Sequence, residues 1–125
     1  MVTFYRCRHC GNVIIKLHDS HVPVVCCKEE MAILTANTEE ASFEKHIPII
    51  RKTETVTEIL IGETLHPMTE DHAIEWIYVE TRQGGYIHNL KPTDEPKIQT
   101  VMKQDDILAV YSYCNLHGLW QMKKS

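Results

Sequence analysis

The five cysteines of the 125-residue chain divide into a group of four near the start and a single one near the end. The group of four consists of Cys7-x-x-Cys10 and the adjacent pair Cys26-Cys27, whereas the fifth cysteine opens the string Cys114-x-x-His117. Four thiolates fill a tetrahedral metal site, but a single thiolate among histidines can leave one coordination position open for a substrate. The spacing therefore indicates two different kinds of metal chemistry in one chain.

The N-terminal cysteines have the spacing of a closed metal site. The two residues between Cys7 and Cys10 let both sulfurs face one ion while backbone amides point at them. The pair Cys26-Cys27 completes a tetrahedral set, but neighbours in an extended chain point to opposite faces, so the pair needs a local kink. The spacing allows zinc or a single iron, and two disulfides are the alternative that a reducing compartment disfavours. Closed coordination favours structure or electron transfer over catalysis.

Several histidines further along the chain lie beside turn-like residues. His66 precedes Pro67, and the Cys-x-x-His string is followed by Gly118. Taken singly, each of these histidines fits a surface or core position better than a metal site. Taken together, their spacing leaves a metal site and unrelated histidines equally open. The histidines with this setting are His46, His66, His72 and His117, and those expected at the surface are His9, His18, His21 and His88.

Composition restricts the class of protein. The chain is 24% charged and 43% hydrophobic, as globular proteins are, and it has no run of about 18 apolar residues that could span a membrane. A net charge of −4 without a basic stripe argues against a nucleic-acid partner. The first residues lack the apolar core of a signal peptide, so we expect a cytoplasmic protein whose clustered thiols are reduced.

Apolar residues alternate along the chain and predict short antiparallel strands in a sandwich. The glycines of Gln83-Gly84-Gly85 predict a hairpin turn between two of them. The stretch Met31–Ala41 is weakly patterned and fits a turn of helix or a linker. The expected strands are Val13–Leu17, Ile47–Arg51, Val56–Ile61, Ile74–Glu80, Tyr86–Leu90, Ile98–Met102 and Ile107–Tyr113.

We place a domain boundary near Ala36–Thr38, which gives domains of residues 1–36 and 37–125. A piece of fewer than about 40 residues is rarely held together by apolar burial alone. Metal bound by the four cysteines could supply the missing stability.

The chain resembles the desulfoferrodoxins, the two-iron form of superoxide reductase, in a set of strings that keep the family's order over nearly the whole length. The segment 16–21 lacks the glycines that are common there in the family. The matching strings are Tyr5-Arg6-Cys7-Arg8-His9-Cys10-Gly11-Asn12, Val25-Cys26-Cys27-Lys28-Glu29-Glu30-Met31, Glu44-Lys45-His46-Ile47-Pro48-Ile49, His66-Pro67-Met68-Thr69-Glu70-Asp71-His72-Ala73-Ile74-Glu75-Trp76-Ile77 and Tyr113-Cys114-Asn115-Leu116-His117-Gly118-Leu119-Trp120.

This resemblance implies a mainly β protein: a small rubredoxin-like or desulforedoxin-like domain followed by an immunoglobulin-like sandwich of seven antiparallel strands. It also implies two iron ions per chain, the first held by four cysteines and the second by four equatorial histidines and one axial cysteine. The implied ligands are Cys7, Cys10, Cys26 and Cys27 for the first iron, and His46, His66, His72, His117 and Cys114 for the second.

Two charged residues lie beside the implied ligand His46. Because a chain of charge −4 repels superoxide, Lys45 would attract the anion to the site and could orient a proton-donating water; the alternative is an ordinary exposed lysine. Glu44 resembles the family's carboxylate that occupies the open position once the iron is ferric. On a regular strand Glu44 and His46 would share a face while Lys45 pointed away. We therefore expect a bent, mobile loop at these residues. Trp76 and Trp120 fit either packing near the imidazoles or a place in the core.

The implied activity is the one-electron reduction of superoxide to hydrogen peroxide without release of dioxygen, in oxidative-stress detoxification. A rubredoxin-like electron donor and a homodimer are the implied partners. Two other functions remain open: an iron-binding electron-transfer protein without catalysis, and a superoxide dismutase, which would also evolve dioxygen. An open coordination position distinguishes the enzyme from the carrier, and dioxygen production distinguishes the dismutase from the reductase.

Overall fold

The structure is a computed structural model that describes residues 2–38, 41 and 43–123. The chain divides into two compact units, Met1–Thr35 and Ala36–Ser125. Within the described residues, no helix is both long and apolar enough to cross a membrane.

The N-terminal unit is built from very short strands. A three-stranded antiparallel sheet has the order β2-β1-β5, and a separate hairpin pairs β3 with β4. Among the described residues of this unit, Phe4 and Cys7 are buried, each 2% exposed. So small a core is the reason that we expect metal to contribute to the stability of this unit. The strands are β1 (Phe4–Arg6), β2 (Val13–Ile15), β3 (Val25–Cys26), β4 (Glu29–Glu30) and β5 (Ala32–Ile33).

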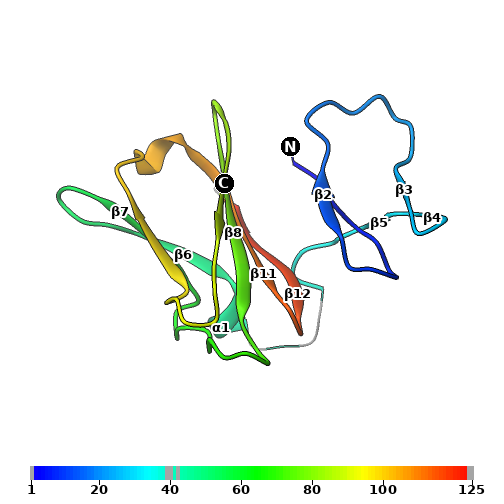
Figure 1. The fold of residues 1–125 in the computed structure, drawn as a ribbon. Helices are drawn as coiled ribbons and strands as arrows, with labels where there is room; N and C mark the ends of the chain where they lie inside the picture. The colour runs from blue at the N-terminus through cyan, green and yellow to red at the C-terminus, as the bar shows by residue number, and fades with distance from the viewer. Residues whose placement is uncertain (1, 39–40, 42, 124–125) are drawn as a thin grey trace. The chain divides into compact units, whose positions relative to one another are not determined.

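The second unit is a sandwich of two antiparallel sheets, with strand orders β10-β7-β6 and β12-β11-β8-β9 (Figure 1). Inward-facing residues of both sheets form one core, in which Ile59, Ile77 and Val110 are fully buried. The elements are α1 (Phe43–His46), β6 (Pro48–Lys52), β7 (Thr57–Ile61), β8 (Ile74–Thr81), β9 (Gly84–Asn89), β10 (Lys97–Thr100), the 3-10 helix η1 (Gln104–Asp106), β11 (Ile107–Cys114) and β12 (Gly118–Lys123).

The mainly β fold, with a small cysteine-bearing unit and a seven-stranded sandwich, is as expected. Each strand expected in the sandwich is present with shifted ends, but β12 was missed because it begins at a glycine and its burial does not alternate cleanly. The expected helix or linker at Met31–Ala41 is partly wrong, since β5 lies there. Within that stretch, residues 39 and 40 lie outside the described residues.

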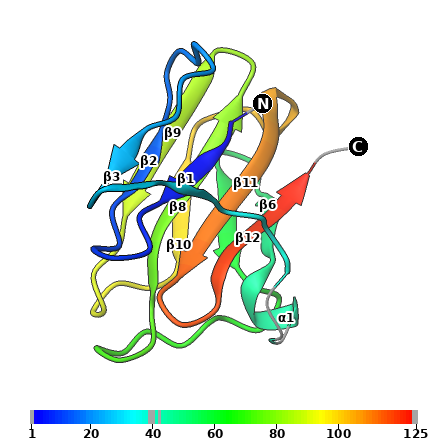
Figure 2. The same cartoon turned by 90° about the vertical axis from the view of Figure 1, so that its right-hand side faces the viewer.

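One end of the sandwich carries α1, the turn between β11 and β12, and the loop that leads into β8, as both views show (Figures 1 and 2). The single turn of α1 is closed by a hydrogen bond from the Ile47 amide to the Phe43 carbonyl, 3.0 Å. Pro48 then begins β6, and a proline disfavours helix in the residue before it. The chain therefore turns directly from a helical residue, His46, into the sheet.

Candidate metal centres

The four N-terminal cysteines form a group whose sulfur atoms all lie within 4.8 Å of one another. Cys10 Sγ is 3.6 Å from Cys26 Sγ, a thiol–thiol contact between the two halves of the group. The backbone amides of His9 and Cys10 donate to Cys7 Sγ at 3.4 and 3.5 Å. Converging sulfurs with amides pointed at them are what a tetrahedral thiolate site requires.

The kink expected at the adjacent cysteines is present. Cys27 and Lys28 have φ angles of 52° and 65°, and they are the two central residues of the turn between β3 and β4. Positive φ at both positions is the geometry of the hairpin turns that match the twist of strands. The turn rotates Cys27 away from the alternation of the strand, so that its sulfur joins that of Cys26.

Crowding of the sulfurs shifts the thiol pKa values in opposite directions. The amides of Cys10 and His9 lower the pKa of Cys7 to about 6, whereas hydrogen bonding with Cys7, Cys10 and Cys26 raises the pKa of Cys27 to about 12. Contact with Cys10 and Cys7 likewise raises the pKa of Cys26. At neutral pH, a metal ion that binds all four as thiolates must therefore displace protons.

Glu29 links the β3–β4 hairpin to the turn that carries Cys7 and Cys10. Its carboxylate accepts from Arg8 Nη1 at 3.1 Å and contacts His9 Nε2 at 2.5 Å. His9 is exposed, as expected, although it lies between two cysteines of the group. Exposed pairs of this kind contribute little to stability individually, about 0–1 kcal/mol.

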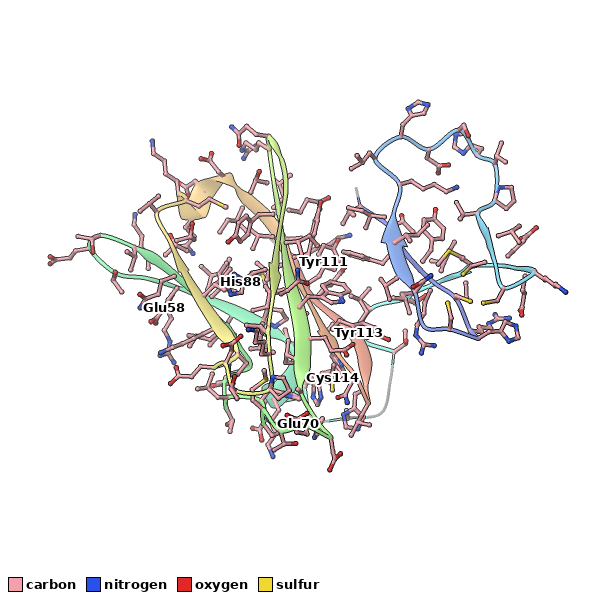
Figure 3. The ribbon with its side chains drawn as sticks, in the orientation of Figure 1. Glu58, Glu70, His88, Tyr111, Tyr113 and Cys114 are labelled. Carbon is pink, nitrogen blue, oxygen red and sulfur yellow. The ribbon has the colours of Figure 1, made fainter. Side chains whose placement is uncertain are left out.

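A second group lies at the end of the sandwich described above. The ligand atoms of His46, His72, Cys114 and His117 all lie within 4.8 Å of one another. His46 Nε2 is 3.2 Å from His117 Nδ1, and Cys114 Sγ is 3.9 Å from the same nitrogen. Figure 3 shows Cys114 toward the same end of the sandwich as Glu70, while Tyr113 and Tyr111 follow β11 away from it.

His66 joins this group through His46. Its Nε2 lies 3.1 Å from His46 Nε2, and the rings of His66 and His72 have centroids 4.5 Å apart. Because His66 Nδ1 bonds to the Pro67 carbonyl at 2.7 Å, the proton belongs on Nδ1 and the Nε2 lone pair faces the other imidazoles. His66 does not fall within 4.8 Å of every other member, so its place as a ligand is a proposal made below.

Within the described residues, His72 Nε2 is the buried side-chain polar atom that has no hydrogen-bond partner. Such an atom is costly unless something satisfies it, and a metal ion at the centre of the surrounding donors would do so. Burial lowers the pKa of His66 to about 4 and, with help from His117 and Lys45, lowers the pKa of His72. Both imidazoles are therefore neutral at pH 7, as metal ligands must be.

Burial raises the pKa of the Cys114 thiol, and the backbone amides of Leu116 and His117 oppose that rise. Cys114 is 0% exposed, whereas His72 and His117 are partly exposed. The group thus has a buried sulfur and is reached by solvent beside two of its imidazoles. The donor set of imidazoles and one thiolate suits iron, zinc or copper by softness.

Contacts from distant parts of the chain hold His46 and His117. Ser112 Oγ donates to the His46 carbonyl at 3.1 Å, and the Trp120 indole lies over the His46 ring with centroids 4.8 Å apart. Trp120 Nε1 also donates to the His117 carbonyl at 3.0 Å. Trp120 is fully buried, so it both packs in the core and contacts the imidazoles. Trp76 instead stacks on Tyr113, 5.4 Å between centroids.

The bent loop expected at residues 44–46 is wrong, because these residues belong to the helical turn α1. A helix separates successive side chains by about 100°, so His46 points inward while Glu44 and Lys45 are exposed. The charge of Lys45 reaches the group, since it contributes to lowering the pKa of His72.

Residues that position α1 were not identified from the sequence. The clearest is Gly62, with φ of 89°, where an added Cβ would lie 2.3 Å from the Glu44 carbonyl oxygen and 2.5 Å from the Lys45 carbonyl carbon. A glycine directly after the apolar strand β7 is the one local signal that could have pointed to this close approach. Ser112 offers no such signal, because its partner lies 66 residues away.

Fold and site together define a two-unit β metalloprotein, with a four-cysteine group in one unit and a histidine–cysteine group at the end of a seven-stranded, immunoglobulin-like sandwich. The desulfoferrodoxin family model matches residues 38–123, and the chain belongs to that family. Its two groups match those of the two-iron desulfoferrodoxins.

Individual relatives match nearly the whole chain. It is 40% identical to a desulfoferrodoxin of Nitratidesulfovibrio vulgaris over 94% of this chain and 92% of the relative. It is 39% identical to a desulfoferrodoxin homolog of Archaeoglobus fulgidus over 94% and 93%. The crystal structure of the superoxide reductase from Treponema pallidum covers 98% of this chain and 99% of its own, with a TM-score of 0.78 and 27% identity.

Proposed function

We propose that the protein is a superoxide reductase, which reduces superoxide by one electron and two protons to hydrogen peroxide without releasing dioxygen. One observation carries the proposal: four imidazoles and a buried thiolate converge at the solvent-reached end of the sandwich, around a His72 nitrogen that has no hydrogen-bond partner among the described residues. The structural likeness to the Treponema pallidum superoxide reductase supports it.

In this proposal His46, His66, His72, His117 and Cys114 would hold the second iron and would leave one coordination position for substrate. Ferrous iron bound there would supply the electron. The chain supplies neutral imidazoles and a single thiolate, so the loaded site keeps a net positive charge that favours an anion. The buried Cys114 thiolate would donate electron density to the iron.

Lys45 and Glu44 act beside the metal. The whole chain carries a charge of −4 and repels superoxide, so a local cation is needed to draw the anion to the site. Exposed Lys45, whose charge reaches His72, provides that field and can hold a proton-donating water. Exposed Glu44 is the carboxylate that can approach the site after turnover. Both stand on the one helical turn that also carries His46.

The N-terminal unit would hold the first iron with Cys7, Cys10, Cys26 and Cys27. Because its four-thiolate coordination leaves no position for substrate, its role is structural or electron-transferring. We assign the domains to residues 1–36 and 37–125, which the two compact units support. A rubredoxin-like donor would re-reduce the protein, which we expect to be a homodimer.

An anaerobic experiment tests the proposal. The reduced, iron-loaded protein is mixed with superoxide, and oxidised iron, peroxide and dioxygen are measured together. A superoxide reductase yields peroxide in proportion to the iron oxidised and no dioxygen. Dioxygen release would instead indicate a dismutase. Loss of superoxide no faster than its spontaneous decay would indicate an electron carrier and overturn the proposal.

A further inference from the structure

Asn115 follows Cys114 directly, and its side chain bonds to a distant loop. Its Nδ2 donates to the Asp71 carbonyl at 2.9 Å, and its Oδ1 accepts from the Ala73 amide at 3.0 Å. Its backbone amide adds a bond to the Ala73 carbonyl at 3.2 Å. The oxygen and the nitrogen of the side-chain amide therefore both bond to backbone, at two residues, Asp71 and Ala73, that have one residue between them.

The residue between those two partners is His72. Its own backbone is held from the other side, since its amide donates to Thr69 Oγ1 at 3.0 Å and its carbonyl accepts from the Thr69 amide at 2.9 Å. Its Nε2 has no partner within the described part of the chain. Because Nε2 itself has no such bond, the direction of the imidazole depends on the hydrogen bonds that hold the backbone before and after His72.

Asn115 lies where the pairing between β11 and β8 ends. The ladder between β11 and β8 is regular from Ala109 to Tyr113, but its register shifts between Tyr113 and Cys114. Beyond that irregularity only Cys114 is still paired, with Ile74, and strand pairing does not reach the β11–β12 turn or the loop before β8. The three bonds of Asn115 span this gap.

We infer that Asn115 is a positioning residue that fixes His72 against Cys114 and His117, without itself binding metal or substrate. The inference rests on the proposed function in taking His72 as a ligand. Supporting bonds of this kind around a metal ligand are typically worth about 10–100-fold in metal affinity. Because Asn115 is exposed and its φ is not among the positive values, an alanine there should leave the fold intact.

The chain offers a matched control in the same unit. Asn37 also makes two side-chain bonds to backbone, with Nδ2 donating to the Gln121 carbonyl at 3.1 Å and Oδ1 accepting from the Gln121 amide at 2.8 Å. These bonds hold β12 and involve no residue of the histidine–cysteine group. Because Asn37 has φ of 61°, glycine is the replacement that removes both bonds without backbone strain.

The experiment compares the parent full-length protein with Asn115→Ala and Asn37→Gly. Each is titrated anaerobically with isotopically enriched ferrous iron against a chelator. Mössbauer spectroscopy separates iron in four-thiolate sites from iron bound by histidines, so the N-terminal group is an internal reference. Thermal unfolding checks that each variant is folded.

We expect Asn115→Ala to weaken ferrous binding at the histidine–cysteine group about 10–100-fold and, after oxidation of the loaded protein to the ferric state, to alter the sulfur-to-iron charge-transfer band. Asn37→Gly should match the parent in both measurements. Parent-like affinity and spectrum in Asn115→Ala, or an equal loss in Asn37→Gly, would overturn the inference. A parent protein that binds iron at this group but does not consume superoxide would overturn only the proposed function. A parent that binds none there would overturn both.

Discussion

Replacing Gly62 with alanine should displace the helical turn that carries His46. The new Cβ would lie 2.3 Å from the Glu44 carbonyl oxygen and 2.6 Å from Lys45 Cα, whereas ordinary contacts begin at 3.4 Å. These are backbone atoms, so α1 as a whole must move by about 1 Å. Overpacking of this kind costs about 1–3 kcal/mol, and the positive φ of 89° adds about 1–2 kcal/mol.

The two contributions add to about 2–5 kcal/mol, which predicts a fall in unfolding temperature of roughly 10–40 °C for a unit of this size. A displacement near 1 Å at a reacting site can also cost about 100-fold in rate. Calorimetry and the second-order rate of superoxide consumption by pulse radiolysis measure the two effects. Gly84→Ala is the control, because Gly84 also has a positive φ, 139°, but nothing lies within 4 Å of its added Cβ. The reasoning is refuted if Gly62→Ala matches Gly84→Ala in both stability and rate.

Three further changes test the chemistry of the site. Lys45→Ala should slow the encounter with superoxide roughly tenfold and flatten its dependence on ionic strength, measured by pulse radiolysis. Cys114→Ser should abolish the sulfur-to-iron charge-transfer band of the ferric protein and most of its activity, because the proposed thiolate ligand would be lost. The metal-free protein should lose stability to urea as the pH falls from about 6.5 toward 4. Burial depresses the pKa of His66 to about 4, so the unfolded chain binds the proton first.

Each of these has a contrary outcome. Lys45→Arg should keep the parent rate, and an unchanged rate and salt slope in Lys45→Ala would exclude steering by this residue. An unchanged visible spectrum in Cys114→Ser would exclude Cys114 as a ligand. For the pH dependence, the stability of His66→Gln to urea should fall less than that of the parent between about pH 6.5 and 4. His18→Gln, which changes an exposed histidine, should behave as the parent does. Equal curves for all three proteins would contradict the assignment to His66.

Local spacing predicted the four-cysteine group because its geometry is local. Cys7 and Cys10 share one turn, and the adjacent pair Cys26-Cys27 shares another, so the positions of the sulfurs follow from a few residues on each side. The kink at Cys27 could be predicted for the same reason, since two neighbours on one extended strand cannot face one ion.

The histidine–cysteine group could not be predicted from spacing in the same way. Its members come from α1, two stretches of the loop before β8, the end of β11 and the β11–β12 turn, and only the tertiary fold brings them together. The resemblance to the family, and not the periodicity of the sequence, indicated which histidines and which cysteine belong to one group. Neither source identified Ser112 or Asn115, whose partners lie 66 and 42–44 residues away.

The helix at residues 43–46 was missed because four residues are too few to show a period of 3.6. Its existence depends on contacts from other elements, above all the close approach of Gly62 and the bond from Ser112. A single helical turn has little stability of its own in water. Tertiary packing therefore decided the conformation of the segment that carries Glu44, Lys45 and His46.

His46 stands directly before the sheet that contains β6, whereas Cys114 and His117 belong to the hairpin of the opposite sheet. A metal ion bound by these residues would link the two sheets of the sandwich at one end. Without that ion, the two sheets would separate first at this end. Native-state hydrogen exchange after chelation should therefore begin in the residues at this end, while the amides of Ile59 and Val110 in the core stay protected.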